Sequence, residues 1–66
     1  MTIKTNMGNI TATKEMLNYL ALLAWDAVKQ NRLEGYLTIA EDAKALANDI
    51  HEALNANGYY NGGLKK

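Results

Sequence analysis

Seven consecutive apolar residues, Tyr19 to Trp25, lie in the middle of the first of two segments with helical periodicity. In a surface helix, polar residues normally interrupt any apolar run longer than three or four residues, because only one stripe faces the core. A run of seven places apolar side chains on every side of the helix. Since the chain offers only one other helical segment, the run predicts a contact with something outside the monomer.

The size of the chain leads to the same expectation. A chain of 66 residues forms one domain at most, and a single core of this size rarely supplies more than about 3–5 kcal/mol. Small domains add disulfides, a structural metal or oligomerisation, but this chain has no cysteine and only one histidine, His51. We therefore expect no cofactor and no metal, and instead self-association or docking on a larger protein.

The charges argue against nucleic acid as a partner, and the hydropathy pattern argues against a membrane. Seven basic and seven acidic residues cancel, which leaves no electrostatic attraction for nucleic acid, and Arg32 is the only arginine. A membrane span needs roughly 20 apolar residues, whereas Asp26 and Lys29 end the apolar run early. No signal peptide is visible at the N-terminus. We expect a cytoplasmic protein that binds neither nucleic acid nor membrane.

The periodicity predicts a single small all-α domain over residues 1–66, an antiparallel helical hairpin. The first helix is predicted at about 13–33 and the second at about 39–56. Residues 1–10 are predicted to form an irregular arm, because a lone strand there would have no other strand to pair with. Residues 57–66, rich in glycine and ending in two lysines, are predicted to form a flexible tail.

Local signals mark the ends of both helices. Thr13 is suited to cap the first helix, and Gly35 is suited to end it, because glycine readily takes the left-handed conformation. Thr38 and Glu41 have the spacing of a capping box, in which each side chain accepts a hydrogen bond from a backbone N–H at the start of a helix. Asn57–Gly58 is predicted to end the second helix.

At about 100° per residue, the first helix has an apolar face broad enough for two rows of contacts. One row would pack on the second helix, and the other would form the seam of a symmetric dimer, which gives a four-helix bundle. The first row consists of Met16, Leu20, Leu23 and Ala27, and the second of Leu17, Ala24 and Val28.

Three apolar side chains remain outside these rows. Tyr19 and Leu22 fall among polar residues of the helical wheel, and Trp25 lies at the boundary of the apolar face. Aromatic anchors concentrate binding energy at interfaces, so these three residues form the predicted partner-binding patch. The alternative is that the tail folds back and that Tyr59 or Tyr60 covers Leu22.

The residues that carry catalysis are nearly absent. The chain has no serine and no cysteine, which removes the two commonest nucleophiles, and Glu52, next to His51 in the sequence, is expected to point away from it. Asp42, Asp49 and Glu52 are expected to form a solvated acidic flank, because one open helix face does not supply converging oxygen ligands. We expect no enzymatic activity.

Residues 37–46 resemble the first helix of helix-turn-helix repressors, with a threonine cap and an alanine at the same spacing, which implies DNA binding. The sequence departs from that family at 47–48, where no glycine marks the turn. Asp49 and Glu52 also occupy the would-be recognition segment, where they would repel phosphate. A small DNA-binding transcriptional regulator is therefore the second alternative.

The first hypothesis is a small, non-enzymatic protein–protein interaction module. Stand-alone chains of this size often act on larger proteins, and phages and other mobile elements encode many of them. We therefore expect an inhibitor or modulator of a larger host protein that acts in the host cytoplasm. The alternative is a structural or assembly subunit that forms a helical oligomer.

Overall fold

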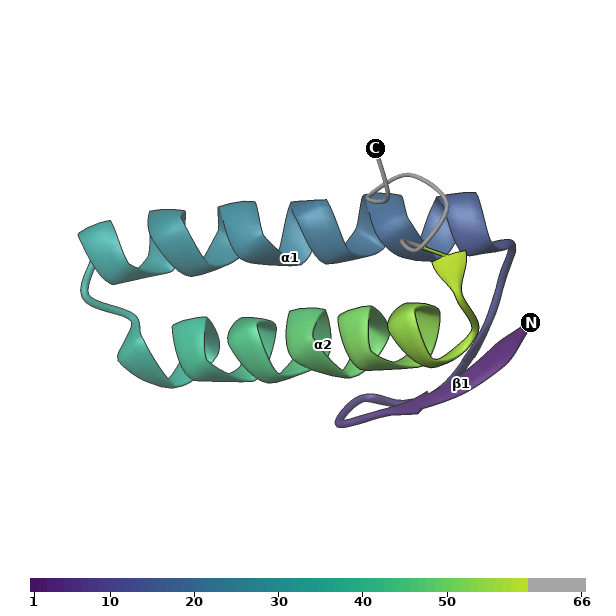
Figure 1. The fold of residues 1–66 in the computed structure, drawn as a ribbon. Helices are drawn as coiled ribbons and strands as arrows, with labels where there is room; N and C mark the ends of the chain where they lie inside the picture. Colours follow the sequence, from purple (N-terminus) through teal and green to yellow (C-terminus); the bar gives the residue numbers. More distant parts are fainter. Residues whose placement is uncertain (60–66) are drawn as a thin grey trace.

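A β-hairpin is followed by two long antiparallel helices in the computed structural model, which describes residues 1–59 (Figure 1). The predicted helical hairpin is confirmed, and most of the described chain is helical. The elements in order are β1 (Thr2–Thr5), β2 (Gly8–Thr11), α1 (Lys14–Leu33) and α2 (Leu37–Ala56).

The N-terminal segment is a two-stranded antiparallel hairpin, so the predictions of an irregular arm over 1–10 and of a purely helical fold are wrong. The segment supplies both strands itself, and Ile3 pairs with Ile10 in the ladder. Gly8 takes a φ of 102°, which suits the tight connection between the strands. The Thr5 hydroxyl reinforces the connection by donating to the Gly8 carbonyl at 2.8 Å and accepting from the Met7 N–H at 3.0 Å.

The β-hairpin is fastened to α2 by one buried side chain and two hydrogen bonds. Ile3 is only 5% exposed and joins the core. The backbone N–H of Asn6 donates to Asp49 Oδ2 at 2.9 Å, and the Asn6 side-chain amide donates to the Asp42 carbonyl at 3.1 Å. These contacts link the turn of the hairpin to a helix about forty residues further along the chain.

Helix α1 begins and ends where its local signals predict. The Thr13 hydroxyl accepts a hydrogen bond from the Met16 N–H at 3.1 Å, which satisfies one of the free donors at the helix start. The chain leaves the helix after Glu34, and Gly35 takes a φ of 84°. A residue with a side chain would be strained in this left-handed conformation.

Helix α2 begins two residues earlier than predicted, and the predicted capping box does not form. Tyr36 is the N-cap residue and makes no side-chain capping bond, while Thr38 lies within the first turn. The turn at Gly35 brings the Tyr36 N–H to the Asn31 carbonyl at 2.8 Å, so the second helix can start at once. Its end at Asn57, followed by Gly58 with a φ of 76°, agrees with the prediction.

The core lies along the contact between the two helices and continues under β1. Small alanines alternate with larger aliphatic residues at this contact, which lets the helix backbones approach closely. The buried residues are Leu17, Ala21, Ala24 and Val28 of α1, Ala40, Ala47, Ile50 and Leu54 of α2, and Ile3 of β1.

Tyr59, beyond the end of α2, is half-buried and packs against this core. Leu22 nevertheless stays 56% exposed, so Tyr59 does not cover it. Tyr60 and the rest of the predicted tail lie outside the described residues.

Candidate interaction surfaces

The two predicted rows of α1 have different environments in the fold. Leu17, Ala24 and Val28 are buried against α2. The other row is only partly covered: Met16 is 50% exposed and Leu23 is 47% exposed, while Leu20 and Ala27 are half-buried. The monomer therefore uses one row for its own core and leaves the second row without a covering helix among the described residues. Ala21 belongs to neither predicted row of α1, but it is fully buried.

Helix α2 extends this uncovered row. Ile39 is 53% exposed. At about 100° per residue it lies on the same side of α2 as Leu46 and Ala53. These two residues pack against the core cluster that includes Ile3. The β-hairpin runs along that side of α2 from near its C-terminal end to Asp42, whose carbonyl accepts from the Asn6 amide, and Ile39 stays exposed just beyond. In an antiparallel pair of helices, this side of α2 adjoins the uncovered row of α1. We call the combined surface the open face, formed by Met16, Leu20, Leu23, Ala27 and Ile39.

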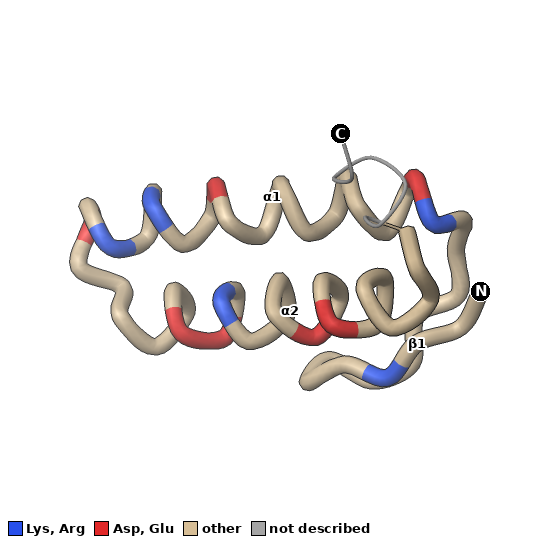
Figure 2. The backbone as a smooth tube through the Cα atoms, viewed as in Figure 1, with Lys and Arg blue, Asp and Glu red and all other residues tan. Residues whose placement is uncertain are grey.

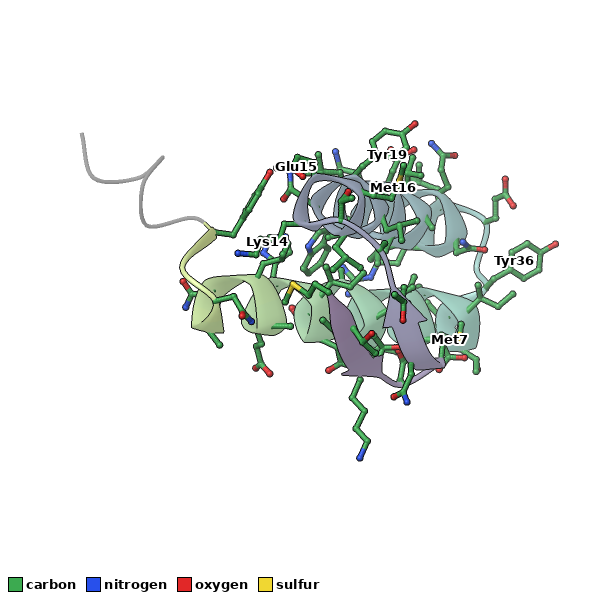
Figure 3. All side chains as sticks on the ribbon, turned by 90° about the vertical axis from the view of Figure 1, so that its right-hand side faces the viewer. Met7, Lys14, Glu15, Met16, Tyr19 and Tyr36 are labelled. Carbon is green, nitrogen blue, oxygen red and sulfur yellow. The ribbon has the colours of Figure 1, made fainter. Side chains whose placement is uncertain are left out.

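Two further exposed apolar side chains lie beside the open face. Figure 3 looks along the helices and shows Tyr36 and Met7 projecting from the same side of the molecule, with Tyr19 on the outer surface of α1. All three are exposed. Sequence analysis missed Tyr36 and Met7, because each is a single apolar residue in a connection and belongs to no periodic pattern.

Charged residues avoid the open face. Residues 16–25 of α1 contain none, and Figure 2 shows an uncharged stretch of this helix between the charged residues of its first turn and those of its C-terminal half. In α2, acidic residues outnumber basic ones four to one, with Lys44 as the single cation. The part of the open face that precedes Asp26 on α1 is free of charge and formed by large aliphatic side chains, which is the composition of the buried core of a protein interface.

The three residues of the predicted partner patch do not gather in one place. Tyr19, Leu22 and Trp25 follow each other at intervals of three, so they trace a diagonal row that turns by about 120° around the helix. Tyr19 and Leu22 are exposed and Trp25 is half-buried. Leu22 and Trp25 both line a shallow hollow on α1, and Tyr19 lies toward the open face instead.

This hollow has a volume of about 310 Å³ and is bordered by two cations. Lys29 and Arg32 line it together with the carboxylate of Asp26. Arg32 is held loosely by Glu41 of α2 at 3.9 Å, an exposed pair that contributes little to stability. A second hollow adjoins it toward the end of the helix and is also lined by Leu33, which is 83% exposed.

Residues with catalytic or ligand-binding potential do not converge. Within residues 1–59, no group of three His, Asp or Glu residues is placed to hold a metal ion. Asp49 of the acidic flank accepts the hydrogen bond from Asn6, which is a structural role that the sequence did not reveal. Neither α1 nor α2 has the combination of length and hydropathy that a membrane crossing requires.

No protein-family model matches the chain. No curated protein matches it, and no solved structure matches it.

Proposed function

We propose that this chain is a small, non-enzymatic interaction module that acts by binding another protein on its open face. The observation that carries the proposal is the second apolar row of α1, in which Met16 and Leu23 remain about half exposed, together with the exposed Ile39 toward the start of α2. Fully burying a side chain of this size that starts wholly exposed contributes roughly 1.5–3 kcal/mol. Covering each of these half-exposed side chains contributes a part of that free energy. A partner that covers this face therefore gains a substantial apolar contact.

The shape of the molecule supports the proposal. Its principal extents are 37 × 29 × 15 Å, so the two helices form a single thin layer. Domains are normally built from at least two packed layers around one core. A second layer supplied by another protein would complete the architecture.

Within this proposal, the module is an inhibitor or modulator of a larger protein. The diagonal row of Tyr19, Leu22 and Trp25 extends the contact area from the edge of the open face around α1. Its encoding by a phage or another mobile element, and its action in a host cytoplasm, remain predictions.

A structural or assembly subunit is the second candidate, and the same face supports it. Two open faces placed against each other make a four-helix bundle in which the row containing Leu20 and Leu23 forms the dimer seam. In that case the covering layer is a second copy of the chain.

A single substitution on the open face tests the function. Leu23→Asp places a charge in the middle of the face, and Leu37→Asp is the matched control, because Leu37 is exposed on α2 away from the uncovered row. Tagged versions of the wild type and both variants are used to recover a partner, which is identified by mass spectrometry, purified and titrated by calorimetry. We expect Leu23→Asp to abolish the titration heat and Leu37→Asp to retain it. Equal binding by both variants would remove the open face as the binding site.

Light scattering of the purified chain separates the two candidates. A mass twice that of the monomer, reduced to the monomer mass by Leu23→Asp, would favour the four-helix bundle. A monomer that binds the recovered partner would favour the modulator.

A further inference from the structure

A second pattern runs along the side of α1 that is turned away from α2. Leu22, Asp26, Lys29 and Leu33 follow each other at intervals of four, three and four residues, and all four side chains are exposed. This is the spacing of the seam in a coiled coil, where residues from two helices interlock. We call these four residues the outer stripe.

The outer stripe is complementary to itself when it is read in the opposite direction. Leucines stand at both ends, and an acid and a base stand at equivalent positions in the centre. If two copies of α1 lie antiparallel about a twofold axis between Asp26 and Lys29, each aspartate faces the lysine of the second copy. The same axis places Leu22 against Leu33 of the second copy. A twofold interface requires such self-complementarity, because residue i contacts j and j contacts i.

The surface along the outer stripe has hollows at the places where this pairing needs them. The hollow of about 310 Å³ lies beside Leu22 and Trp25, where the pairing places Leu33 of the second copy. The adjoining hollow is lined by Leu33, Asp26 and Lys29, where it places Leu22 of the second copy. Leu33 and Leu22 are 83% and 56% exposed, so both are available as knobs for these holes.

We propose that the outer stripe is a self-association site, at which α1 binds α1 of a second copy in the antiparallel direction. The charges select the direction: a parallel pair in register would place aspartate against aspartate and lysine against lysine, which is repulsive. Charged residues at seam positions lower the stability of a helix pair but fix its register. The contact is therefore specific and weaker than an all-leucine seam.

This pairing shares Leu22 with the diagonal row but uses no residue of the open face, and it goes beyond the proposed function. The twofold axis runs perpendicular to the helices, so it brings the two open faces to the same side of a layer of four helices. The pair thereby presents two equivalent binding surfaces to one partner assembly. Linked sites of this kind raise overall affinity without any new contact.

Charge exchange on the full chain tests the proposal. Sedimentation velocity is measured over micromolar to millimolar concentrations for the wild type, Asp26→Lys, Lys29→Asp and the double variant. Glu52→Lys on α2 is the control, and circular dichroism verifies that each variant remains helical. We expect the wild type to dimerise and each single variant to weaken the dimer by at least about tenfold, because each creates two like-charge pairs. The double variant and the Glu52→Lys control dimerise like the wild type.

Mixing the two single variants gives the most specific readout. In a heterodimer of Asp26→Lys and Lys29→Asp, every central lysine faces an aspartate, so an equimolar mixture associates more tightly than either variant alone. A wild type that stays monomeric at millimolar concentration would overturn the proposal, as would a dimer that the single variants leave intact. Failure of both the double variant and the mixture to restore association would overturn it as well.

Ile39→Asp distinguishes association through the open face from association through the outer stripe, because Ile39 lies on α2 and is not a residue of the stripe. Self-association through the outer stripe survives this substitution, whereas a four-helix bundle through the open face is lost. A dimer that Ile39→Asp dissociates and Asp26→Lys leaves intact would thus overturn the outer stripe and support the four-helix bundle.

Discussion

Ile3 carries the contribution of the β-hairpin to the core, and truncating it tests the fold most directly. Its side chain is 5% exposed and packs in the cluster of Leu17, Ala21, Ile50 and Leu54. Ile3→Val removes one buried carbon, and such changes typically cost about 0.5–1.5 kcal/mol. Ile3→Ala costs about 2–5 kcal/mol. Because a core of this size supplies only about 3–5 kcal/mol in total, the alanine variant should lose most of the free energy of unfolding.

Thermal unfolding followed by far-UV circular dichroism, with the fluorescence of Trp25 as a second probe, measures these losses. In a domain of this size 1 kcal/mol corresponds to about 4–8 °C, so we expect Ile3→Val to lower Tm by about 5 °C and Ile3→Ala to melt near room temperature. Met7→Ala is the control within the same hairpin, because Met7 is exposed and its truncation should change Tm by less than about 2 °C. Equal melting temperatures for the wild type, Ile3→Val and Met7→Ala would refute the reasoning, since the hairpin would then add nothing to the core.

The remaining predictions concern a cap, a turn and a hydrogen bond, and each is checked by urea unfolding. Thr13→Ala removes the N-cap of α1 and should cost about 1 kcal/mol, whereas Thr38→Ala, inside the first turn of α2, should cost nothing; equal losses would contradict the capping roles. Gly35→Ala should cost about 1–2 kcal/mol because φ is 84°, although no atom lies within 4 Å of the added methyl group, and an unchanged midpoint would exclude strain. Asp49→Ala removes the carboxylate that accepts from the Asn6 N–H and should cost about 0.5–1.5 kcal/mol of unfolding free energy. Asp42→Ala keeps the backbone carbonyl that accepts from the Asn6 amide and should be neutral. A larger loss for Asp42→Ala than for Asp49→Ala would disprove this arrangement.

The helical hairpin was predictable because its signals are local. Thr13 and Gly35 mark a helix start and end through the conformation of their own backbone, so no knowledge of distant contacts is needed. The Thr38–Glu41 box failed for the opposite reason. The tight connection after Gly35 starts α2 two residues early, and tertiary geometry then outweighs the local capping preference.

The β-hairpin was missed because its stabilising contacts are remote in sequence. Ile3 packs against Ile50 and Leu54, and Asn6 binds Asp49, so nothing near the two strands reveals what supports them. A hairpin of two strands is marginal by itself, which makes the prediction of an irregular arm reasonable from the local sequence alone.

The interaction surfaces were predictable in part. Periodicity revealed two apolar rows on α1, but only the packing of α2 decides which row is buried. Leu22 was identified because it interrupts a polar side of the helix, whereas Leu33 was missed because it follows Arg32 at the helix end, where the apolar pattern has already stopped. The outer stripe becomes visible only once both leucines are known to be exposed.

The attachment of the N-terminal hairpin to α2 has a consequence for how the chain folds. The helices form mainly from neighbouring residues, but Ile3 gains its environment only when Ile50 and Leu54 are in place. Contacts that close long loops form late and slow the folding of small domains. During synthesis the first strand therefore gains its packing only after residues 50–54 have left the ribosome. Until then, the edges of both strands and the side chain of Ile3 stay available to other chains, so the newly made protein is most prone to aggregation just before its last contact forms.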